Sequence, residues 1–279
     1  MRRVTAELIK DKVIKTAILA NIKLRADVLA CLKNACLKEK NSLAKKAISS
    51  IIENAEIAQK KKIAICQDTG LPVVFAEIGN EVFIDGDIKK IIIQAVGNAY
   101  RDTALRASIQ ADPITRSRKN SFSPCIVHTD VIKGKKIKIT LMPKGFGSEN
   151  KAQVKMLSPT ATVQEIEDFI VQTVKQAGAS ACPPYIIGVG IGGTQDYAAL
   201  LAKKALLNPI SKQNKNLKLA KLEKQLLKKI NKLNIGAFGF KGKNTAIAVK
   251  IKTYPTHIAG LPVAVNISCH ALRSASVTI

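Results

Sequence analysis

The chain has 279 residues, 47% of them hydrophobic, which is enough apolar material for a large core and excludes a disordered protein. Its formal charge of +25 would attract nucleic acids or anionic ligands, but 37 of the 45 basic residues are lysines and aromatic residues make up only 4%. Arginine forks and aromatic stacking platforms are therefore scarce. We expect a solvated, lysine-rich surface and no nucleic-acid binding, although the charge keeps a basic nucleic-acid-binding module open as an alternative.

No apolar run reaches the roughly 20 residues that span a membrane, and the start of the chain lacks the apolar segment of a secretory signal. The six cysteines are too sparse for a disulfide scaffold, and no two of them form a CxxC pair. We therefore expect a cytoplasmic protein without a membrane segment, whose thiols are core residues or metal ligands.

Apolar residues recur at helical spacing in the first part of the chain, with a break at Asn41-Ser42, which predicts N-terminal helices over about 1–60. Asp85-Gly86-Asp87 is typical of a turn that also caps a helix, and that helix is expected to run towards Arg106. Residues 125–128 and 136–141 predict a hairpin around Gly134. Other segments are predicted as strands at 71–79 and 82–84 and as loops at 112–124 and 142–151.

The second half alternates predicted helices with apolar strands: helices at 163–178, 194–207 and 215–233, and strands at 185–190, 245–254 and 261–267. The basic, amphipathic segment 215–233 could lie on a membrane, but it has no aromatic anchor, so we expect a surface helix that covers a sheet. The predicted fold class is α+β, with N-terminal helices followed by a mixed sheet flanked by helices. We expect a single domain, 1–279, with helices over about 1–60 and the sheet within about 61–279; the short polar stretch 211–216 is the best candidate boundary.

The segment Gly188-Val189-Gly190-Ile191-Gly192-Gly193 fits the G-x-G-x-x-G pattern of a dinucleotide site, after a strand and before a helix. Such a site also needs an acidic residue about 20 positions further on, and none occurs between Asp196 and Glu223. An NAD-dependent enzyme is therefore disfavoured, while a glycine-rich turn near a cluster or an anionic substrate stays open.

Three cysteines lie at the edges of apolar runs, beside polar or turn residues: Cys66 in Ile-Cys-Gln-Asp-Thr-Gly, Cys182 in Ala-Cys-Pro-Pro-Tyr and Cys269 in Ile-Ser-Cys-His-Ala. Three thiolates can hold an iron–sulfur cluster whose usual complement is four protein ligands, which leaves one coordination position open. An open iron can act as a Lewis acid on a substrate hydroxyl. Spacing alone does not show that the three thiols meet.

Six motifs occur in a fixed order: Cys-Gln-Asp-Thr-Gly at 66–70, Lys-Gly-Phe-Gly-Ser-Glu-Asn at 144–150, Cys-Pro-Pro-Tyr at 182–185, Gly-Val-Gly-Ile-Gly-Gly-Thr at 188–194, Thr-His-Ile-Ala-Gly-Leu-Pro-Val-Ala-Val-Asn at 256–266 and Cys-His-Ala at 269–271. Together they resemble the alpha subunit of two-subunit class I fumarate hydratases and of the related L(+)-tartrate dehydratases, over nearly the whole chain. The loop 120–124, the segment 239–242 and Leu272-Arg273-Ser274 depart from the family pattern, which affects loop detail and the subunit interface.

The resemblance implies a 4Fe-4S cluster on Cys66, Cys182 and Cys269, with Cys31, Cys36 and Cys125 structural. It also implies that five residues contact the substrate: Gln67, Asp68, Arg106, Gly147 and His257. Taken singly, Arg106 could decorate a helix end and His257 could be an ordinary core histidine.

The activity implied by the resemblance is a hydro-lyase that interconverts L-malate and fumarate, a tricarboxylic acid cycle reaction, on a small dicarboxylate substrate. Proton removal needs a base, which the resemblance assigns to a separate beta subunit in a heterotetramer of two alpha and two beta chains, so no catalytic residue is assigned in this chain. L(+)-tartrate dehydration remains the main alternative.

Overall fold

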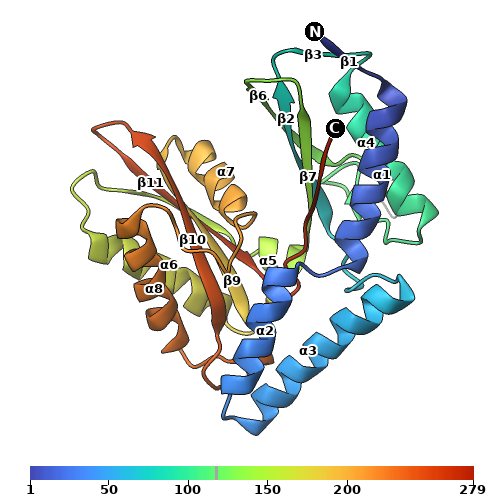
Figure 1. The fold of residues 1–279 in the computed structure, drawn as a ribbon. Coiled ribbons are helices and arrows are strands. Elements are labelled where there is room, and N and C mark those ends of the chain that lie inside the picture. Colours follow the sequence, from blue (N-terminus) through green and yellow to red (C-terminus); the bar gives the residue numbers. More distant parts are fainter. Residues whose placement is uncertain (117–118) are drawn as a thin grey trace. The chain divides into compact units, whose positions relative to one another are not determined.

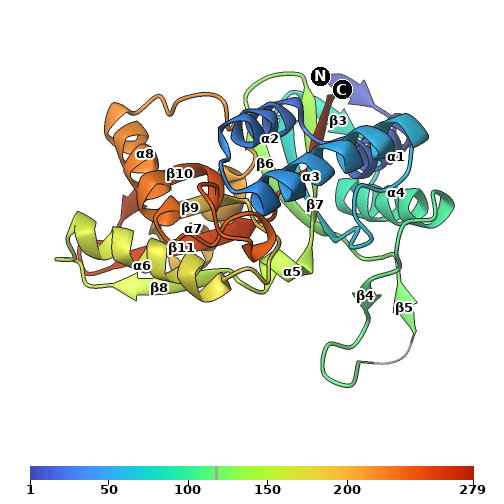
Figure 2. The same ribbon diagram turned by 90° about the horizontal axis from the view of Figure 1, so that it is seen from below.

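The computed structural model describes residues 1–116 and 119–279. The chain forms two compact units: the first contains Met1–Arg25, Ala55–Phe146 and Arg273–Ile279, and the second contains Ala26–Asn54 and Gly147–Leu272. Both combine helices with mixed sheets, as Figures 1 and 2 show for each, so the predicted α+β class is confirmed. That the two units act as one domain stays a prediction. The stretch 211–216 lies inside the second unit and does not separate them.

The first unit is built on a four-stranded sheet in the order β12-β7-β2-β6, with α1 and α4 packed together and against it. Two small two-stranded sheets, β1-β3 and β4-β5, complete it. Its elements are β1 (Arg2–Val4), α1 (Ala6–Ile22), β2 (Leu71–Gly79), β3 (Val82–Ile84), α4 (Ile88–Asp102), β4 (Ile109–Gln110), β5 (Asn120–Ser121), β6 (Ile126–Ile132), β7 (Ile137–Lys144) and β12 (Ala275–Thr278). The helix α3 (Ser42–Lys61) and the one-turn helix α5 (Phe146–Glu149) contribute residues to both units.

The predicted hairpin of β6 and β7 is wrong, because β2 lies between these strands, parallel to β6 and antiparallel to β7. The connection through Gly134 crosses the end of β2, where a Cβ on Gly79 would lie 2.2 Å from the Gly134 carbonyl oxygen. β2 is apolar and mostly buried, whereas β6 is largely exposed. The buried strand therefore takes the interior position and the exposed strand the edge.

Helix boundaries follow the expected capping chemistry, with one correction. Asp87 caps α4 by accepting the backbone N–H groups of Lys89 and Lys90, as predicted. The helix ends at Asp102, so Arg106 lies in the loop beyond it and not on the helix.

The predicted loop 112–124 contains the short strand β5, and residues 117 and 118 of that loop lie outside the described residues. The predicted loop 142–151 contains the end of β7 and all of α5.

The second unit has a four-stranded sheet in the order β10-β9-β11-β8. Ile170 and Val174 of α6 and Leu226 of α8 share one apolar core with the sheet, while α7 packs on the other face through a separate alanine cluster. Its elements are α2 (Ala26–Lys38), β8 (Gln153–Leu157), α6 (Val163–Ala177), β9 (Tyr185–Gly193), α7 (Gln195–Ala205), α8 (Leu217–Asn231), a 3-10 turn (Ala237–Gly239), β10 (Ala246–Thr256) and β11 (Leu261–Ser268). The segment around α8 is thus a helix that covers a sheet, as expected.

The glycines of the G-x-G-x-x-G segment lie within β9 and serve helix packing. A Cβ on Gly188 would lie 2.2 Å from the Ala202 carbonyl oxygen, and one on Gly190 would lie 2.0 Å from the Ala198 carbonyl oxygen. Only glycine allows α7 to approach the strand this closely. The buried strand predicted at 185–190 is therefore confirmed, and Gly188 and Gly190 do not form the glycine-rich turn that the sequence left open.

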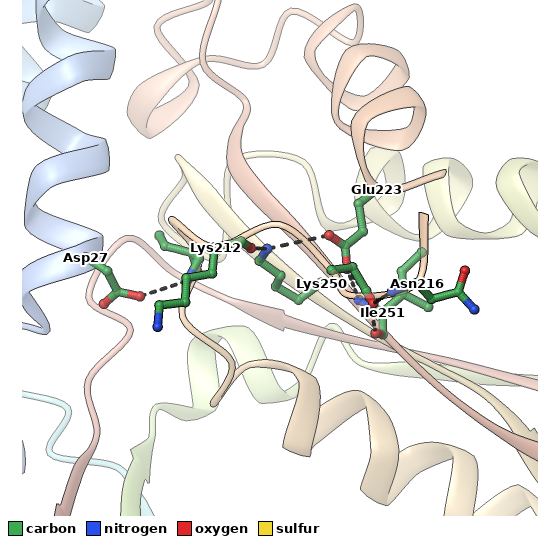
Figure 3. Close-up of polar contacts among 8 residues, drawn as sticks. Asp27, Lys212, Asn216, Glu223, Lys250 and Ile251 are labelled. Carbon is green, nitrogen blue, oxygen red and sulfur yellow. Dashed lines mark hydrogen bonds and ion pairs between the residues drawn. The ribbon is translucent and has the colours of Figure 1, made fainter. Parts of the chain in front are cut away.

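A buried ion pair fixes the segment between α7 and α8 (Figure 3). Lys250 Nζ lies 3.5 Å from Glu223 Oε2 and donates to the Lys212 carbonyl oxygen at 2.5 Å. Glu223 Oε1 accepts the Ile251 N–H and the Asn214 side-chain N–H, both at 2.9 Å. This pair lies in the wall of a 440 Å³ cavity. Because the two opposite charges neutralise each other, we assign the pair a structural role.

Among the described residues, no helix has both the length and the apolar content needed to span a bilayer.

Candidate metal centre and substrate site

The Cys66–Gly70 turn precedes β2. Buried polar side chains hold it through hydrogen bonds. The Thr69 carbonyl oxygen accepts the Tyr100 hydroxyl at 2.8 Å, and Asn21 Nδ2 donates to that hydroxyl at 3.2 Å. Burial raises the pKa of Tyr100 to about 12, so the hydroxyl stays protonated and keeps donating. Gly70 has φ +70°, and a Cβ there would lie 2.7 Å from the Lys144 backbone. The turn is therefore rigid on its buried side, while the Cys66 side chain is half-buried.

Asp68 connects this turn to the start of α5. Its Oδ1 accepts the Gly70 N–H at 2.9 Å, and its Oδ2 accepts the Phe146 N–H at 2.8 Å. A carboxylate offers about four lone-pair positions, so two remain for other donors. Gln67 is exposed on the same turn.

Arg106 is brought to the turn by its backbone. Its N–H donates to Thr69 Oγ1 at 3.1 Å, while its side chain is exposed. The loop after α4 thus brings the backbone of Arg106 to the turn that carries Gln67 and Asp68, so three predicted site residues lie within one unit. A planar guanidinium can hold a carboxylate by two parallel hydrogen bonds.

Cys182 and Cys269 are brought together in the second unit. Cys182 precedes β9 and Cys269 follows β11, and these strands pair so that Ser268 lies opposite Ile186. The Cys182 carbonyl oxygen accepts the backbone N–H of His270 at 3.3 Å and its ring Nδ1–H at 3.0 Å. Burial, with smaller contributions from Cys182 and Cys269, raises the pKa of Tyr185 to about 12.

Cys182 is also held in an unusual backbone conformation, with φ +57°. Left-handed backbone is uncommon for a residue with a side chain, and such strain is concentrated at functional sites. The thiol of Cys182 is exposed and that of Cys269 is half-buried.

The remaining cysteines differ in environment from these three. Cys125 is buried in the core of the first unit, and burial raises its pKa to about 12, which suits an apolar filler rather than a thiolate ligand. Burial and the nearby Asp27 likewise raise the pKa of Cys31. In the part of the chain that the structure describes, no three His, Cys, Asp or Glu side chains form a group that could hold a metal ion, and no disulfide joins the cysteines.

Comparison with known proteins identifies the family. The model of the family described as fumarate hydratase (fumerase) matches residues 10–278. The chain belongs to the fumarate hydratase family. Enzymes of this family are hydro-lyases, which add water to a carbon–carbon double bond or remove it.

Several relatives carry the name of a different diacid. The "Putative L(+)-tartrate dehydratase subunit alpha" of Methanocaldococcus jannaschii is 40% identical over 275 residues, which cover 96% of each chain. The L(+)-tartrate dehydratase subunit alpha of Escherichia coli K12 is 28% identical over 256 residues, covering 91% of this chain and 84% of that protein. The family and the alpha-type chain predicted from the motifs are therefore confirmed.

Gly147 and His257, the other two predicted contacts in this fumarate hydratase family member, lie in the second unit. Gly147 is exposed in α5, and a Cβ there would meet nothing within 4 Å, so packing does not require glycine. His257 is exposed beside a 430 Å³ cavity shared with Tyr197 and Tyr254, and its Nδ1 accepts the Ala259 N–H at 3.2 Å. In the neutral ring the proton therefore lies on Nε2.

His257 is remote from the two thiols of its own unit. It follows Thr256, which pairs with Gly193 at the last residue of β9, whereas Cys182 precedes the first residue, Tyr185. At about 3.3 Å per residue, the strand alone separates the two ends by more than about 20 Å. The second unit therefore does not bring His257 to Cys182 and Cys269.

Three residues that hold the backbone of the candidate site were not predicted from the sequence. Tyr100 holds Thr69, His270 holds Cys182, and Arg273 Nη2 donates to the Asp68 carbonyl oxygen at 2.5 Å. Each acts through a backbone oxygen far away in the sequence, which local patterns do not reveal. The one available signal was that His270 directly follows Cys269.

Proposed function

We propose that this chain is the cluster-bearing alpha subunit of a fumarate hydratase that interconverts L-malate and fumarate. The observation that carries the proposal is the hydrogen bonding of His270 to Cys182, which holds the segments of Cys182 and Cys269 together. The third candidate thiol, Cys66, begins a turn that Asp68 anchors through its carboxylate. The cytoplasm is the proposed compartment.

The chemistry of the three thiols supports an iron–sulfur cluster, although the described residues contain no preassembled group of three ligands. Cys66, Cys182 and Cys269 are each solvent-accessible to some degree, unlike Cys125, and thiolates are the usual ligands of such clusters. These three residues would hold a 4Fe-4S cluster. When bound, it supplies a Lewis-acidic iron without a protein ligand, suited to a substrate hydroxyl.

The first unit would bind the diacid. The exposed Arg106 guanidinium takes one carboxylate in a bidentate pair, and the Gln67 amide can donate to the same anion. Asp68, held by two backbone N–H groups, keeps lone pairs that accept a substrate hydroxyl. These residues bind and orient the substrate but do not remove the proton from carbon.

A glycine at position 147 would allow substrate to approach the backbone of α5. Since a Cβ there meets no other residue of the chain, the reason for glycine is external to the fold. We assign Gly147 a backbone contact with the substrate.

The proton-removing base would belong to a separate beta subunit. The names of the relatives, "subunit alpha", support a partner chain, and we propose a heterotetramer of two alpha and two beta subunits. A second alpha chain also accounts for His257. Because His257 is too far from Cys182 and Cys269 of its own chain, we infer that it contacts the substrate bound by the other alpha chain.

L(+)-tartrate is the second candidate substrate, because relatives at 40% and 28% identity are named for it. Tartrate carries one more hydroxyl than malate, and the same carboxylate and hydroxyl contacts would serve both.

An activity assay tests the proposal. The chain, coexpressed with its beta subunit and purified without oxygen, should dehydrate L-malate with a kcat/KM at least about tenfold above that for L(+)-tartrate, which corresponds to about 1.4 kcal/mol. The reverse ratio would establish the tartrate alternative. Full turnover by the alpha chain alone, or no turnover of either diacid by the complex, would refute the proposal.

A further inference from the structure

Arg273 is a buried cation without a counter-ion in the described part of the chain. It is 3% exposed, and its Nη2 donates to the Asp68 carbonyl oxygen at 2.5 Å. Its Nε and Nη1 are buried without a hydrogen-bond partner among residues 1–116 and 119–279. It belongs to the first unit together with the Cys66–Gly70 turn, although 205 residues separate it from Asp68.

The carboxylate of Asp68, the residue whose backbone Arg273 holds, is already engaged. Both carboxylate oxygens of Asp68 accept backbone N–H groups, from Gly70 and Phe146. No ion pair joins Arg273 to Asp68 among the described residues. Burying a guanidinium with open N–H groups is unfavourable unless an anion accepts from them.

We propose that Arg273 is a positioning residue for the metal centre: it fixes the turn that carries Cys66, and its open N–H groups donate to the anionic sulfur of the cluster bound there. This inference rests on the proposed cluster. Cys66 lies two residues before the backbone oxygen that Arg273 holds. Sulfur in an anionic cluster accepts hydrogen bonds, and such bonds together with net charge set its reduction potential.

Burial distinguishes this acceptor from a substrate carboxylate. A diacid that exchanges with solvent needs an accessible cation, and Arg106 is exposed for that purpose. Arg273, at 3% exposure, suits a resident anion. A carboxylate acceptor is the competing outcome of the test.

The test compares Arg273→Gln, Arg273→Lys and wild type in the full-length chain with its partner, reconstituted without oxygen. Arg101→Gln is the matched control, because Arg101 is an exposed arginine of the same unit that bonds the neighbouring Asp102 and Asn98. The readouts are iron per chain, the rate of bleaching in air and the equilibrium between oxidised and reduced cluster.

Arg273→Gln should bleach about tenfold faster and shift the redox equilibrium about tenfold towards the oxidised cluster, because a positive charge that favours the reduced form is lost. Arg273→Lys keeps the charge but lacks the planar guanidinium with its several N–H donors. Its redox equilibrium should therefore stay within about threefold of wild type, while bleaching remains faster than in wild type. The control should match wild type. If Arg273→Gln does not fold, the Arg273→Lys comparison alone decides.

The proposal is overturned if the variants match wild type in bleaching and redox equilibrium, or if only the KM for the diacid rises, which would assign Arg273 to a substrate carboxylate. Wild-type protein that takes up no cluster would instead refute the proposed function itself, and this inference with it.

Discussion

The carbonyl oxygen of Cys182 accepts two hydrogen bonds from one residue, His270: the backbone N–H at 3.3 Å and the ring Nδ1–H at 3.0 Å. This contact joins the segment before β9 to the segment after β11, and so it fixes the relative position of the Cys182 and Cys269 backbones. The ring also meets Phe238 edge-on, with 5.3 Å between ring centroids. His270 thus determines how well two of the proposed ligands are preorganised.

Replacing His270 with alanine should weaken the metal centre without unfolding the protein. The ring hydrogen bond to Cys182 is lost while the backbone bond remains, and about 1 kcal/mol of lost stabilisation corresponds to about fivefold faster iron release. Chelator-driven iron loss from the reconstituted chain measures this. His128→Ala, which removes a ring stacked on Phe75 in the other unit, is the control. Equal iron loss from both variants would show that His270 does not support the centre.

Arg106→Lys should raise the KM for the diacid about 10- to 100-fold and change kcat less. Lysine keeps the charge but cannot form two parallel hydrogen bonds to a carboxylate. Thermal unfolding should be unchanged, because the exposed side chain is not needed for the backbone bond to Thr69. Steady-state kinetics beside an Arg101→Lys control test this. A stability loss with unchanged KM would mean that Arg106 only supports the loop.

His257 should act between alpha chains. His257→Ala is expected to lower activity at least about tenfold, and Cys66→Ser to abolish it. A tetramer with one alpha chain of each kind, purified through two different tags, has a complete metal centre in one chain and an intact His257 in the other. We expect this hybrid to recover about half of the wild-type activity.

The same hybrid gives a clear negative result. If His257 serves its own chain, the hybrid stays as inactive as the two parent variants. If His257→Ala alone is fully active, the residue has no contact with the substrate.

The buried pair of Lys250 and Glu223 makes a prediction about stability. Glu223→Gln leaves Lys250 buried without a carboxylate and should lower the free energy of unfolding by about 3 kcal/mol. The double variant Glu223→Gln/Lys250→Met removes both charges and should recover most of that loss. Urea unfolding of the chain measures both. A double variant less stable than Glu223→Gln would mean that Lys250 stabilises the segment mainly through Lys212.

Local sequence patterns predicted helices and strands well where the boundary depends on neighbouring residues. Asp87 and Gly178 mark helix ends through capping chemistry that depends on neighbouring residues, and the structure has both. The α+β class followed from the alternation of such segments. The short strands β8 and β12 were missed, because their pairing with β11 and β7 is not encoded nearby.

The errors arose where tertiary packing overrides a local pattern. Two strands around Gly134 resemble a hairpin, yet the more apolar β2 lies between them. The glycines at 188 and 190 fit a dinucleotide-binding pattern, which the missing acidic residue already disfavoured, and in the structure they allow α7 to approach β9. For the candidate site, the motifs predicted Cys66, Cys182 and Cys269 as ligands, which stays a prediction, but no pattern could reveal that Arg273 holds Asp68 across 205 residues.

The most direct test of the account is the iron content of Cys66→Ser after reconstitution without oxygen, measured beside wild type and Cys36→Ser. Wild type and Cys36→Ser should be brown and hold about four irons per chain, as a 4Fe-4S cluster requires, and Cys66→Ser should be nearly colourless. A Cys66→Ser protein that binds as much iron as wild type, or a wild-type protein that binds none, would contradict the central claim that this thiol completes a three-cysteine metal centre.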